Sequence, residues 1–280
     1  MQPASRRLLS YQETAIDIRR ALTFISGDPH WVRELAVAMV LNVPVVALTA
    51  VGFLEALELL STPLYDLIAG TAWWPLVSGL VAVPLSGFSL RIMRNVIAGR
   101  DVPLPTWAKT GGILRDGLMF WGVTTLWNAP VTILDSLEGW FAPMAETLSR
   151  LSLVLTLLVM LVLPAAQARL AASGTLLAGL DVPAVIRVLR ANAGGYVQLL
   201  LLTMVGAAVA AVPFMVVVGI LTATMTDPGR RLAMAVSLGL VLAMLCVFPY
   251  LMFVFSHLAG QVYLRAVSRL PDAEHATAAA

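Results

Sequence analysis

The chain has 280 residues, of which 59% are hydrophobic and only 12% charged, with a formal net charge of +2. Soluble domains carry roughly 25% charged residues, so this composition, with a mean hydropathy of +0.87, excludes a water-soluble globular protein. One cysteine, Cys246, excludes an intrachain disulfide.

Six uncharged runs follow one another along the chain, and each is long enough to cross a bilayer. The shortest has 18 residues, which at ~1.5 Å per residue reaches about 27 Å, close to the thickness of a hydrocarbon core. The runs are Leu35–Leu54, Leu67–Leu90, Gly117–Leu134, Leu151–Ala168, Ala191–Thr226 and Leu232–Leu264. We therefore predict an all-α fold, a polytopic integral membrane bundle of six transmembrane helices.

The basic residues lie in alternate gaps between these runs. Fifteen of the 18 Lys and Arg side chains fall on one side of the membrane, and Arg150, Arg230 and Arg231 fall on the other. The positive-inside rule then places both termini in the cytosol. We expect a multi-pass protein of the cell inner (cytoplasmic) membrane. Its segments are a cytosolic or interfacial segment at residues 1–34, a transmembrane domain at 35–264 and a cytosolic tail at 265–280.

A short pattern recurs on the cytosolic side, before odd-numbered runs. Residues 97–103 read Ile-Ala-Gly-Arg-Asp-Val-Pro, and residues 177–183 read Leu-Ala-Gly-Leu-Asp-Val-Pro. Gly ends one helix, Asp caps the next and Pro is tolerated in its first turn. We therefore predict three hairpin units, each a cytosolic connector followed by two membrane helices.

The connectors are expected to be short amphipathic helices. Arg187 and Arg190 oppose Val185, Ile186 and Leu189 on a helical projection, and near the start Ile18, Leu22 and Ile25 share one face. Such basic amphipathic helices lie along an anionic inner leaflet. Ordinary soluble loops that carry anchoring charges are the alternative.

Glycines, a Leu-Pro-x-Trp block and an Asn-Ala-Pro triplet are spread through the middle of the chain. They are Gly87, Gly99, Leu104–Trp107, Gly117 and Asn128–Pro130, accompanied by Gly27–Trp31, Phe248–Tyr250 and His257–Gln261. The set resembles an uncharacterised prokaryotic family of polytopic membrane proteins, catalogued as domain of unknown function, family 4013. The resemblance covers residues 15 to 268 and implies a membrane fold without an established activity. The chain differs in having Phe88 where family members often carry Tyr.

The sequence contains few of the residue combinations that enzymes use for catalysis. No Asp, Glu, Lys or Arg lies inside the six runs, and no Ser/His/Asp set or cluster of Cys and His is present. Metalloenzymes, triad hydrolases and transporters driven by protons or sodium all need such groups. We therefore expect a non-enzymatic protein that binds no cofactor, metal or nucleic acid.

One candidate site is a polar cavity. Its residues are Asn42, Asn128, Tyr250, His257 and Gln261, and the last three fall at i, i+7 and i+11 on one helical face. As a site, they would open toward the cytosol. In the alternative interpretation His257 reaches the inner interface, and the two asparagines hold neighbouring helices together.

A second candidate set consists of five cytosolic arginines that can contact lipid phosphates: Arg91, Arg94, Arg115, Arg187 and Arg190. As plain positive-inside anchors they need no ligand. The leading hypothesis is a scaffold or accessory membrane subunit that engages membrane lipids, anionic ones included, or a membrane-protein partner or second copy of the chain. The alternative is a facilitative transporter or channel for a small solute.

Overall fold

Every regular element in the described part of the chain is a helix. The computed structural model describes residues 16–56, 73–100, 104–108, 110–224 and 230–270. The long helices are α3 (Trp31–Ala56), α5 (Trp73–Ile97), α6 (Thr110–Trp140), α7 (Ala145–Ser173), α10 (Ala193–Thr224) and α11 (Arg230–Ser268). The short ones are α2 (Ile18–Thr23), the 3-10 turn η1 (Ala142–Met144), α8 (Leu176–Leu180) and α9 (Val182–Ala191). The predicted all-α class is confirmed for these residues.

Most of the described part of each uncharged run falls on one of the long helices, but fewer runs than expected qualify as membrane spans. Within the described residues, three helical stretches are long and apolar enough to cross a membrane: Ala145–Ser173, Ala193–Val212 and Val247–Ser268. The expected number is six. The run on α6 contains polar residues such as Thr124, Thr125 and Asn128, which lower its mean hydropathy. On α3 and α5, the side chains that the structure describes form only part of each run, too short a stretch to count as a span.

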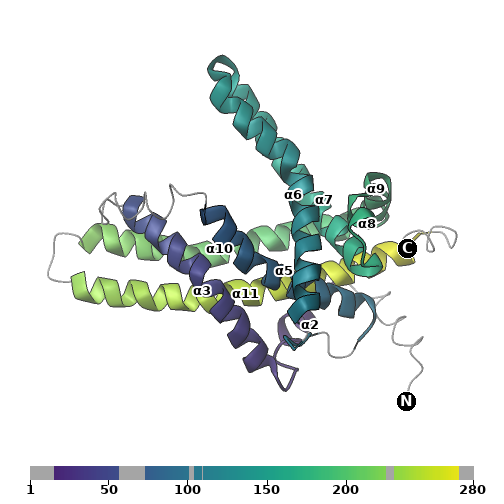
Figure 1. Cartoon of the computed structure of the whole chain (residues 1–280), viewed down its shortest axis with the longest axis horizontal. Coiled ribbons are helices and arrows are strands. Elements are labelled where there is room, and N and C mark those ends of the chain that lie inside the picture. Colours follow the sequence, from purple (N-terminus) through teal and green to yellow (C-terminus); the bar gives the residue numbers. More distant parts are fainter. Residues whose placement is uncertain (1–15, 57–72, 101–103, 109, 225–229, 271–280) are drawn as a thin grey trace.

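The long helices meet at one end, which we call the base. There α3, α6 and α10 begin and α5, α7 and α11 end, with α2, α8 and α9 beside them. In Figure 1, α6 and α7 run side by side away from the base in one direction, whereas α10 and α11 run side by side in another. The base therefore joins helices that separate with distance from it.

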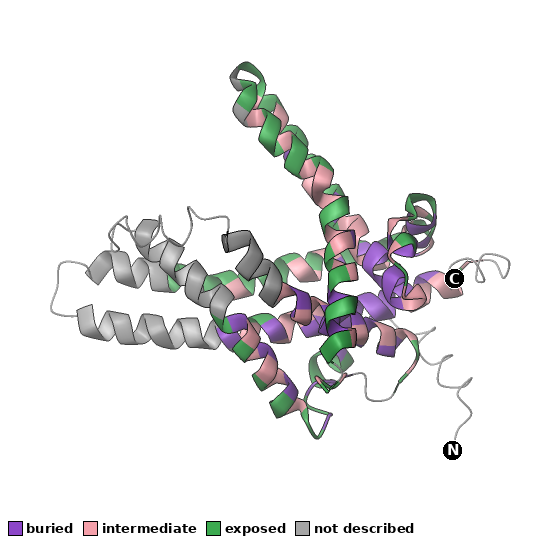
Figure 2. Ribbon diagram, in the orientation of Figure 1, coloured by how far each residue is buried: buried purple, intermediate pink, exposed green. Residues whose placement is uncertain are grey.

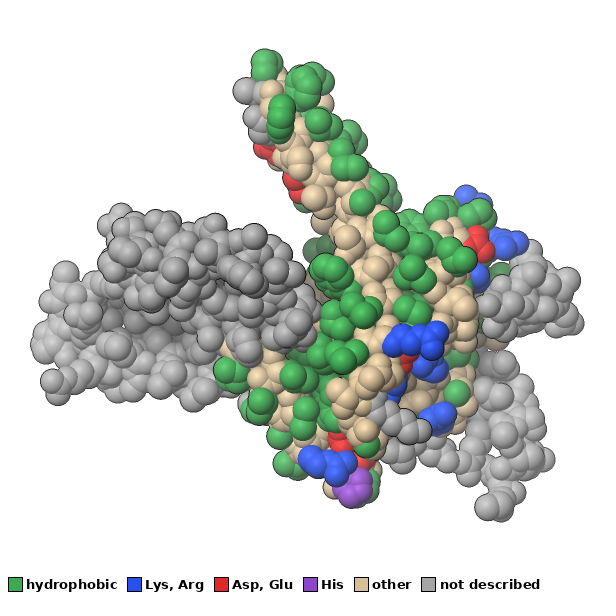
Figure 3. Space-filling model, in the orientation of Figure 1, with side chains coloured by type: hydrophobic (Ala, Val, Ile, Leu, Met, Phe, Trp, Pro, Cys, Tyr) green, Lys and Arg blue, Asp and Glu red, His purple; other side chains and the backbone are tan. Residues whose placement is uncertain are grey.

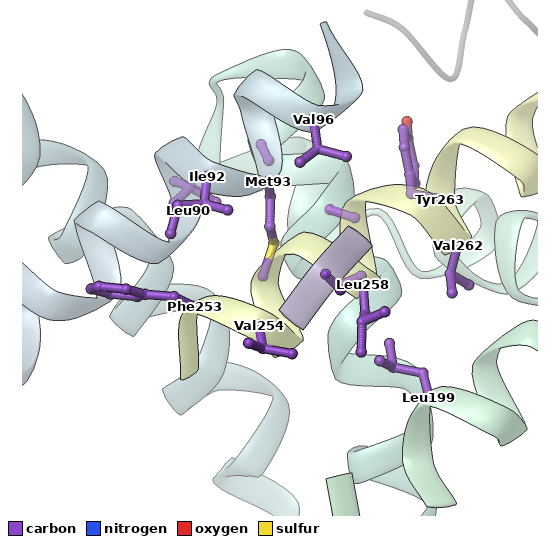
Figure 4. Close-up of a cluster of buried hydrophobic side chains, with 14 of the residues drawn as sticks. Leu90, Ile92, Met93, Val96, Leu199, Phe253, Val254, Leu258, Val262 and Tyr263 are labelled. Carbon is purple, nitrogen blue, oxygen red and sulfur yellow. The ribbon is translucent and has the colours of Figure 1, made fainter. Parts of the chain in front are cut away.

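The buried residues gather in the base, as Figure 2 shows. The last part of α11 is its centre, since Val247–Ser268 is the most buried of the three candidate spans, at 61%. In Figure 4, Phe253, Val254, Leu258 and Val262 of α11 lie among Leu90, Ile92, Met93 and Val96 of α5 and Leu199 of α10. Burial of apolar side chains is the main stabilising term of this core.

Away from the base, α6 and α7 expose large apolar side chains on their outer surfaces (Figure 3). Examples are Leu126, Ile133, Leu153, Val154 and Leu158. Exposed apolar surface on this scale is unfavourable in water and suits a lipid environment.

The repeated seven-residue pattern has two different structural roles. Gly99 follows α5 with φ of 67°, a left-handed conformation that favours glycine and ends the helix as predicted. Gly179 instead lies inside α8, where a Cβ would come within 2.8 Å of a methyl carbon of Val123. The second glycine therefore permits close packing of α8 on α6 and does not end a helix. Residues 101–103 of the first copy lie outside the described residues.

Two connectors form helices, but their apolar faces pack on protein. In α9, the Asp181 carboxylate accepts a hydrogen bond from the Ala184 amide at 3.2 Å, as its predicted capping role requires. The apolar residues Val185 and Val188 are buried, and α9 packs on α7 and α11. In α2 the buried residue is Ala21, whereas Leu22, expected on the apolar face, is exposed. The buried apolar side chains of α9 thus pack on protein, and the expectation that the connectors lie along the leaflet stays a prediction.

Some sequence-based expectations concern parts of the chain beyond those described here. They include residues 1–15 of the first segment, residues 271–280 of the tail and the outer connections at 57–72 and 225–229. Pro84, Pro130, Pro164 and Pro249 each lie within a continuous helix.

Candidate functional site

Three polar side chains of α11 contact the segment that contains α2. The Tyr250 hydroxyl donates to the carbonyl oxygen of Leu22 at 2.6 Å. The Gln261 side chain accepts from the Asp17 amide at 2.9 Å and donates to the Asp17 carbonyl at 3.3 Å. We call Tyr250, His257 and Gln261 the α11 polar strip. The predicted i, i+7, i+11 face thus exists, and the N-terminal segment covers it.

His257 lies fully buried in the middle of this strip. Its ring stacks on Phe24 with centroids 4.5 Å apart and planes inclined by 27°. Its Nδ1 lies 3.0 Å from Nε2 of Gln261, so the amide donates to Nδ1 and the proton of a neutral ring sits on Nε2. Within the described residues that Nε2 has no hydrogen-bond partner. A buried unpaired donor destabilises the fold by about 1–3 kcal/mol unless something binds it.

Neither asparagine forms a hydrogen bond with this strip among the described residues. Asn42 of α3 is buried, and its Nδ2 has no partner among the described residues. Asn128 of α6 donates to the Thr124 carbonyl of its own helix at 2.8 Å. Because α6 packs mainly on α5 and α7, Asn128 belongs to a different part of the molecule from His257. Asn128 therefore lies apart from the predicted polar cavity, whereas Asn42, on a helix that packs on α11, stays a predicted member of it.

A side chain that the sequence analysis did not single out supplies a polar contact between α6 and α7. Gln167 of α7 donates from Nε2 to the Thr124 hydroxyl of α6 at 3.1 Å. A glutamine three residues after Pro164 carries no signal that distinguishes it from a solvent-facing one. A Trp on α6 acts similarly, since Trp127 Nε1 donates to the Gly179 carbonyl of α8 at 2.9 Å.

The five candidate arginines divide into two groups. Arg91 and Arg94 both pair with the Asp116 carboxylate of α6, at 2.7 Å and 3.2 Å, and Arg94 Nε also donates to the Ala171 carbonyl. Asp116 is nearly buried, so this pair of ion pairs ties α5 to α6 and reaches α7. Arg115, Arg187 and Arg190 are exposed and form no ion pair with a described residue. Figure 3 shows basic side chains on the surface of the base.

The Leu-Pro-x-Trp block docks on α3 and α5. Trp107 stacks on Phe88 with ring centroids 4.4 Å apart, and Phe88 in turn lies 4.8 Å from Phe253. Trp107 Nε1 donates to the Glu34 carbonyl at 3.0 Å, and its amide donates to the Glu34 carboxylate at 3.2 Å. Glu34 is 1% exposed. A buried carboxylate outside the uncharged runs was not anticipated, because a Glu at a helix start is usually solvated.

A second buried charge, Arg169, also lies in the base. It is 3% exposed, donates from Nε to the Ala178 carbonyl at 3.0 Å, and lies 3.6 Å from the Asp181 carboxylate. Asn192, between α9 and α10, donates to the Val262 carbonyl of α11 and accepts from Arg269 at 2.8 Å. These contacts fix α8 and α9 against the ends of α7 and α11.

Within the described residues, no three His, Cys, Asp or Glu side chains gather as ligands of a metal ion would. Most of the polar groups described above instead hold helices and connectors together. These contacts position the helices, whereas Arg115, Arg187 and Arg190 are exposed on the surface.

Long apolar helices with lipid-compatible outer surfaces, joined at a charged and hydrogen-bonded base, define a helical membrane protein. The chain belongs to DUF4013, a family of proteins of unknown function, whose model matches residues 72–219, just over half of the chain. The match contains the Gly87, Leu104–Trp107, Gly117 and Asn128–Pro130 motifs but neither the start nor the end of the expected 15–268 resemblance. No curated protein and no solved structure matches the chain.

Proposed function

We propose that the protein is a non-enzymatic scaffold or accessory subunit of the inner membrane, with six crossing helices in three hairpins and both termini in the cytosol. The base lies at the cytosolic surface in this proposal, because 15 of the 18 basic residues belong to its side. Its partners are membrane lipids, anionic ones included, and a membrane protein.

The observation that carries the lipid part of the proposal is the surface of α8 and α9. Arg187 and Arg190 are exposed on the face of α9 opposite the buried Val185 and Val188. On α8, Leu177 is 77% exposed, although a leucine at that level of exposure is unfavourable in water. Exposed apolar and basic side chains on one small unit suit an interface where tails and phosphates meet.

The ion pairs reduce the number of candidate arginines that are available to bind lipid phosphates. Because Arg91 and Arg94 both pair with the Asp116 carboxylate, these two arginines serve the packing of α5 on α6. Arg115, Arg187 and Arg190 keep their charge available to phosphate groups. Each contributes ~1 kcal/mol of attraction near an anionic leaflet, and salt screens that attraction.

Native mass spectrometry of the protein released from mixed anionic and zwitterionic nanodiscs tests the proposal. The unaltered protein should retain anionic lipid preferentially, and Arg187→Gln with Arg190→Gln should remove most of that preference. Arg150→Gln is the control for position, because Arg150 is also exposed but pairs with Glu146 and lies near η1, at the far end of α7. Equal retention of both lipid types by the unaltered protein would leave these arginines as topology anchors.

A facilitative transporter or channel for a small solute is the alternative, and one observation favours it. Asn42 Nδ2 and His257 Nε2 are buried donors without a partner in the described part of the chain. Polar groups left unpaired at depth are found where a solute or water passes. Flux into liposomes that Asn42→Leu abolishes without lowering thermal stability would favour this alternative.

A further inference from the structure

We infer that Arg265 and Arg269, at the end of α11, form a binding site for a phosphate group. The headgroup of an anionic lipid and a soluble phosphate compound share this chemistry. The inference deepens the lipid part of the proposed function, on which it rests for the source of the phosphate but not for the site itself. Neither arginine belongs to the set that carries that proposal.

Arg265 is a partly buried cation without a counter-charge. Its Nε is inaccessible to solvent and donates no hydrogen bond within the described part of the chain. The side chain as a whole is half-buried, in the last turn of α11. A partly desolvated guanidinium that lacks an acceptor destabilises a fold, and such groups in proteins are paired with an anion. An anion that reaches Arg265 therefore gains binding free energy.

Arg269 brings a second positive charge to the same place. It follows Arg265 by one helical turn, near enough for the two guanidinium charges to repel each other. Its Nη1 donates to Asn192 Oδ1 at 2.8 Å and to the Ala191 carbonyl at 3.4 Å. Both acceptors are neutral, so they orient the guanidinium without compensating its charge. Asn192 is itself held in place, because its Nδ2 donates to the Val262 carbonyl at 3.1 Å.

Every acidic side chain that the structure describes in the base has another partner. These carboxylates bind arginines, backbone amides or both, and they are Asp17, Asp28, Glu34, Asp116 and Asp181. Among the described residues, no carboxylate forms an ion pair with Arg265 or Arg269. The two charges are therefore left for an anion from outside the described chain.

A different pair of arginines in the base shows how two guanidinium groups share one anion. Arg91 and Arg94 of α5 converge on the Asp116 carboxylate, at 2.7 Å and 3.2 Å. Arg265 and Arg269 have similar spacing on one helix, without a described acid opposite them. A phosphate group is a compact anion with several acceptor oxygens, which two guanidinium groups can bind together. It supplies what the second pair lacks.

The end of the helix compensates the two charges only in part. Cations near the C-terminus of a helix are stabilised by the carbonyl groups that have no partner within the helix. The Ser268 hydroxyl already binds one of them, the carbonyl of Arg265, at 3.0 Å. The helix end gives Arg265 Nε no acceptor, whereas a phosphate oxygen would.

The position of the pair favours a lipid headgroup as the source of the phosphate. Arg265 lies in the last turn of Val247–Ser268, one of the stretches long and apolar enough to cross a membrane. The end of α11 lies beside α9 in Figure 1, and α9 carries the exposed Arg187 and Arg190. Basic groups at the end of a membrane span are at the level of lipid phosphates. We therefore expect an anionic lipid to bind more tightly than a soluble phosphate.

Thermal unfolding of the full chain in phosphate-free detergent solution tests the site. A ligand that binds the folded protein raises the unfolding temperature in a saturable way. Dihexanoyl phosphatidylglycerol and inorganic phosphate are titrated separately, with chloride keeping the ionic strength constant. The lipid should half-saturate the shift at a concentration about tenfold lower, because its short acyl chains also bury apolar surface. The reverse order would support the same site with a soluble phosphate compound as its ligand.

Variants assign the effect to the two arginines. Arg265→Met and Arg269→Gln should each weaken binding of both ligands about tenfold, because each removes a charge-assisted contact. Arg265→Lys keeps the charge but lacks the Nε donor, and should weaken binding about threefold. Arg115→Gln is the matched control, since it removes an exposed arginine from α6, which packs on α5, α7 and α8.

The stability of Arg265→Met without ligand separates a binding role from a packing role. Methionine keeps an apolar stem and removes the unpaired charge. The unfolding temperature in phosphate-free solution should therefore be unchanged or higher. A lower unfolding temperature together with an unchanged phosphate response would make Arg265 a packing residue and contradict the site.

Two further results would overturn the inference. One is the absence of a saturable shift with either ligand. The other is an equal loss of response in Arg115→Gln and Arg265→Met, which would reduce the effect to net charge. Failure of the proposed lipid function looks different. In that case the unaltered protein retains both lipid types equally in nanodiscs, while Arg265→Met still abolishes the response to inorganic phosphate.

Discussion

The Cβ position of Gly87 on α5 lies 2.8 Å from the backbone nitrogen of Gly117 on α6, closer than a real side-chain carbon approaches. It also lies 1.9 Å from the Ile113 carbonyl oxygen, and a Cβ on Gly117 would lie 1.8 Å from the Val83 carbonyl oxygen. The two helices therefore cross backbone to backbone. Small residues at such crossings let membrane helices approach closely and gain van der Waals contact.

Replacing either glycine at this crossing is expected to separate α5 from α6. Because the obstructing atoms are backbone, they cannot move aside as a flexible side chain would, and we expect Gly87→Ala or Gly117→Ala to destabilise by at least ~1–3 kcal/mol. Thermal unfolding in detergent measures this. Gly111→Ala is the matched control, since its Cβ would meet nothing within 4 Å and alanine favours helix. Unchanged melting of both crossing variants would contradict the close approach.

Asp116 is expected to matter more for stability than either arginine it binds. Asp116→Ala leaves Arg91 and Arg94 together without a counter-charge in a partly buried place, and loss of such a partner costs about 3 kcal/mol. Arg94→Gln leaves the Arg91 pair intact and should cost less. Glu146→Gln is the control, because its pair with Arg150 is exposed and contributes about 0–1 kcal/mol. Equal melting temperatures for Asp116→Ala and the control would count against the network.

The long helices follow from the sequence because lipid solvation imposes a simple rule, a long stretch without charge. Their ends do not, since α6 begins at Thr110 and includes Arg115 and Asp116. Asp116 is tolerated near the start of the helix because it pairs with two arginines on α5, and Arg115 is exposed. A carboxylate 22 and 25 residues away from its partners looks, in the sequence, like any surface acid.

The candidate site was predictable only in part for a related reason. Helical spacing alone placed Tyr250, His257 and Gln261 on one face. What covers that face depends on a contact between Asp17 and Gln261, separated by 244 residues, which no local pattern encodes. Asn128 was grouped with them by polarity and depth, but its hydrogen bond is local to α6. The division of the five arginines into paired and exposed ones likewise required the packing of α5 on α6.

Trp107 holds the connector between α5 and α6 by two separable contacts. Trp107→Phe should keep the ring stacked on Phe88 but leave the Glu34 carbonyl without its donor, at a cost of about 1 kcal/mol. Trp107→Ala also removes the ring and should cost ~3 kcal/mol or more. Trp121→Phe is a suitable control, because Trp121 is 46% exposed on α6. If both Trp107 variants have the same free energy of unfolding as the control, the Leu-Pro-x-Trp block contributes little to the packing of α3 and α5.

The orientation of α6 and α7 gives the most direct test of the membrane arrangement. These helices have 31 and 29 residues, so η1 lies about 44 Å from the end of α7 in the base, more than the ~30 Å of a bilayer core. In a Cys246→Ser background, a cysteine replacing exposed Met144 of η1 should react with an impermeant maleimide added to intact cells. A cysteine replacing exposed Pro183 of α9 should react only after the cells are opened. Labelling of both positions from outside would place α9 on the wrong surface. It would remove the basis for assigning Arg187 and Arg190 to the cytosolic leaflet.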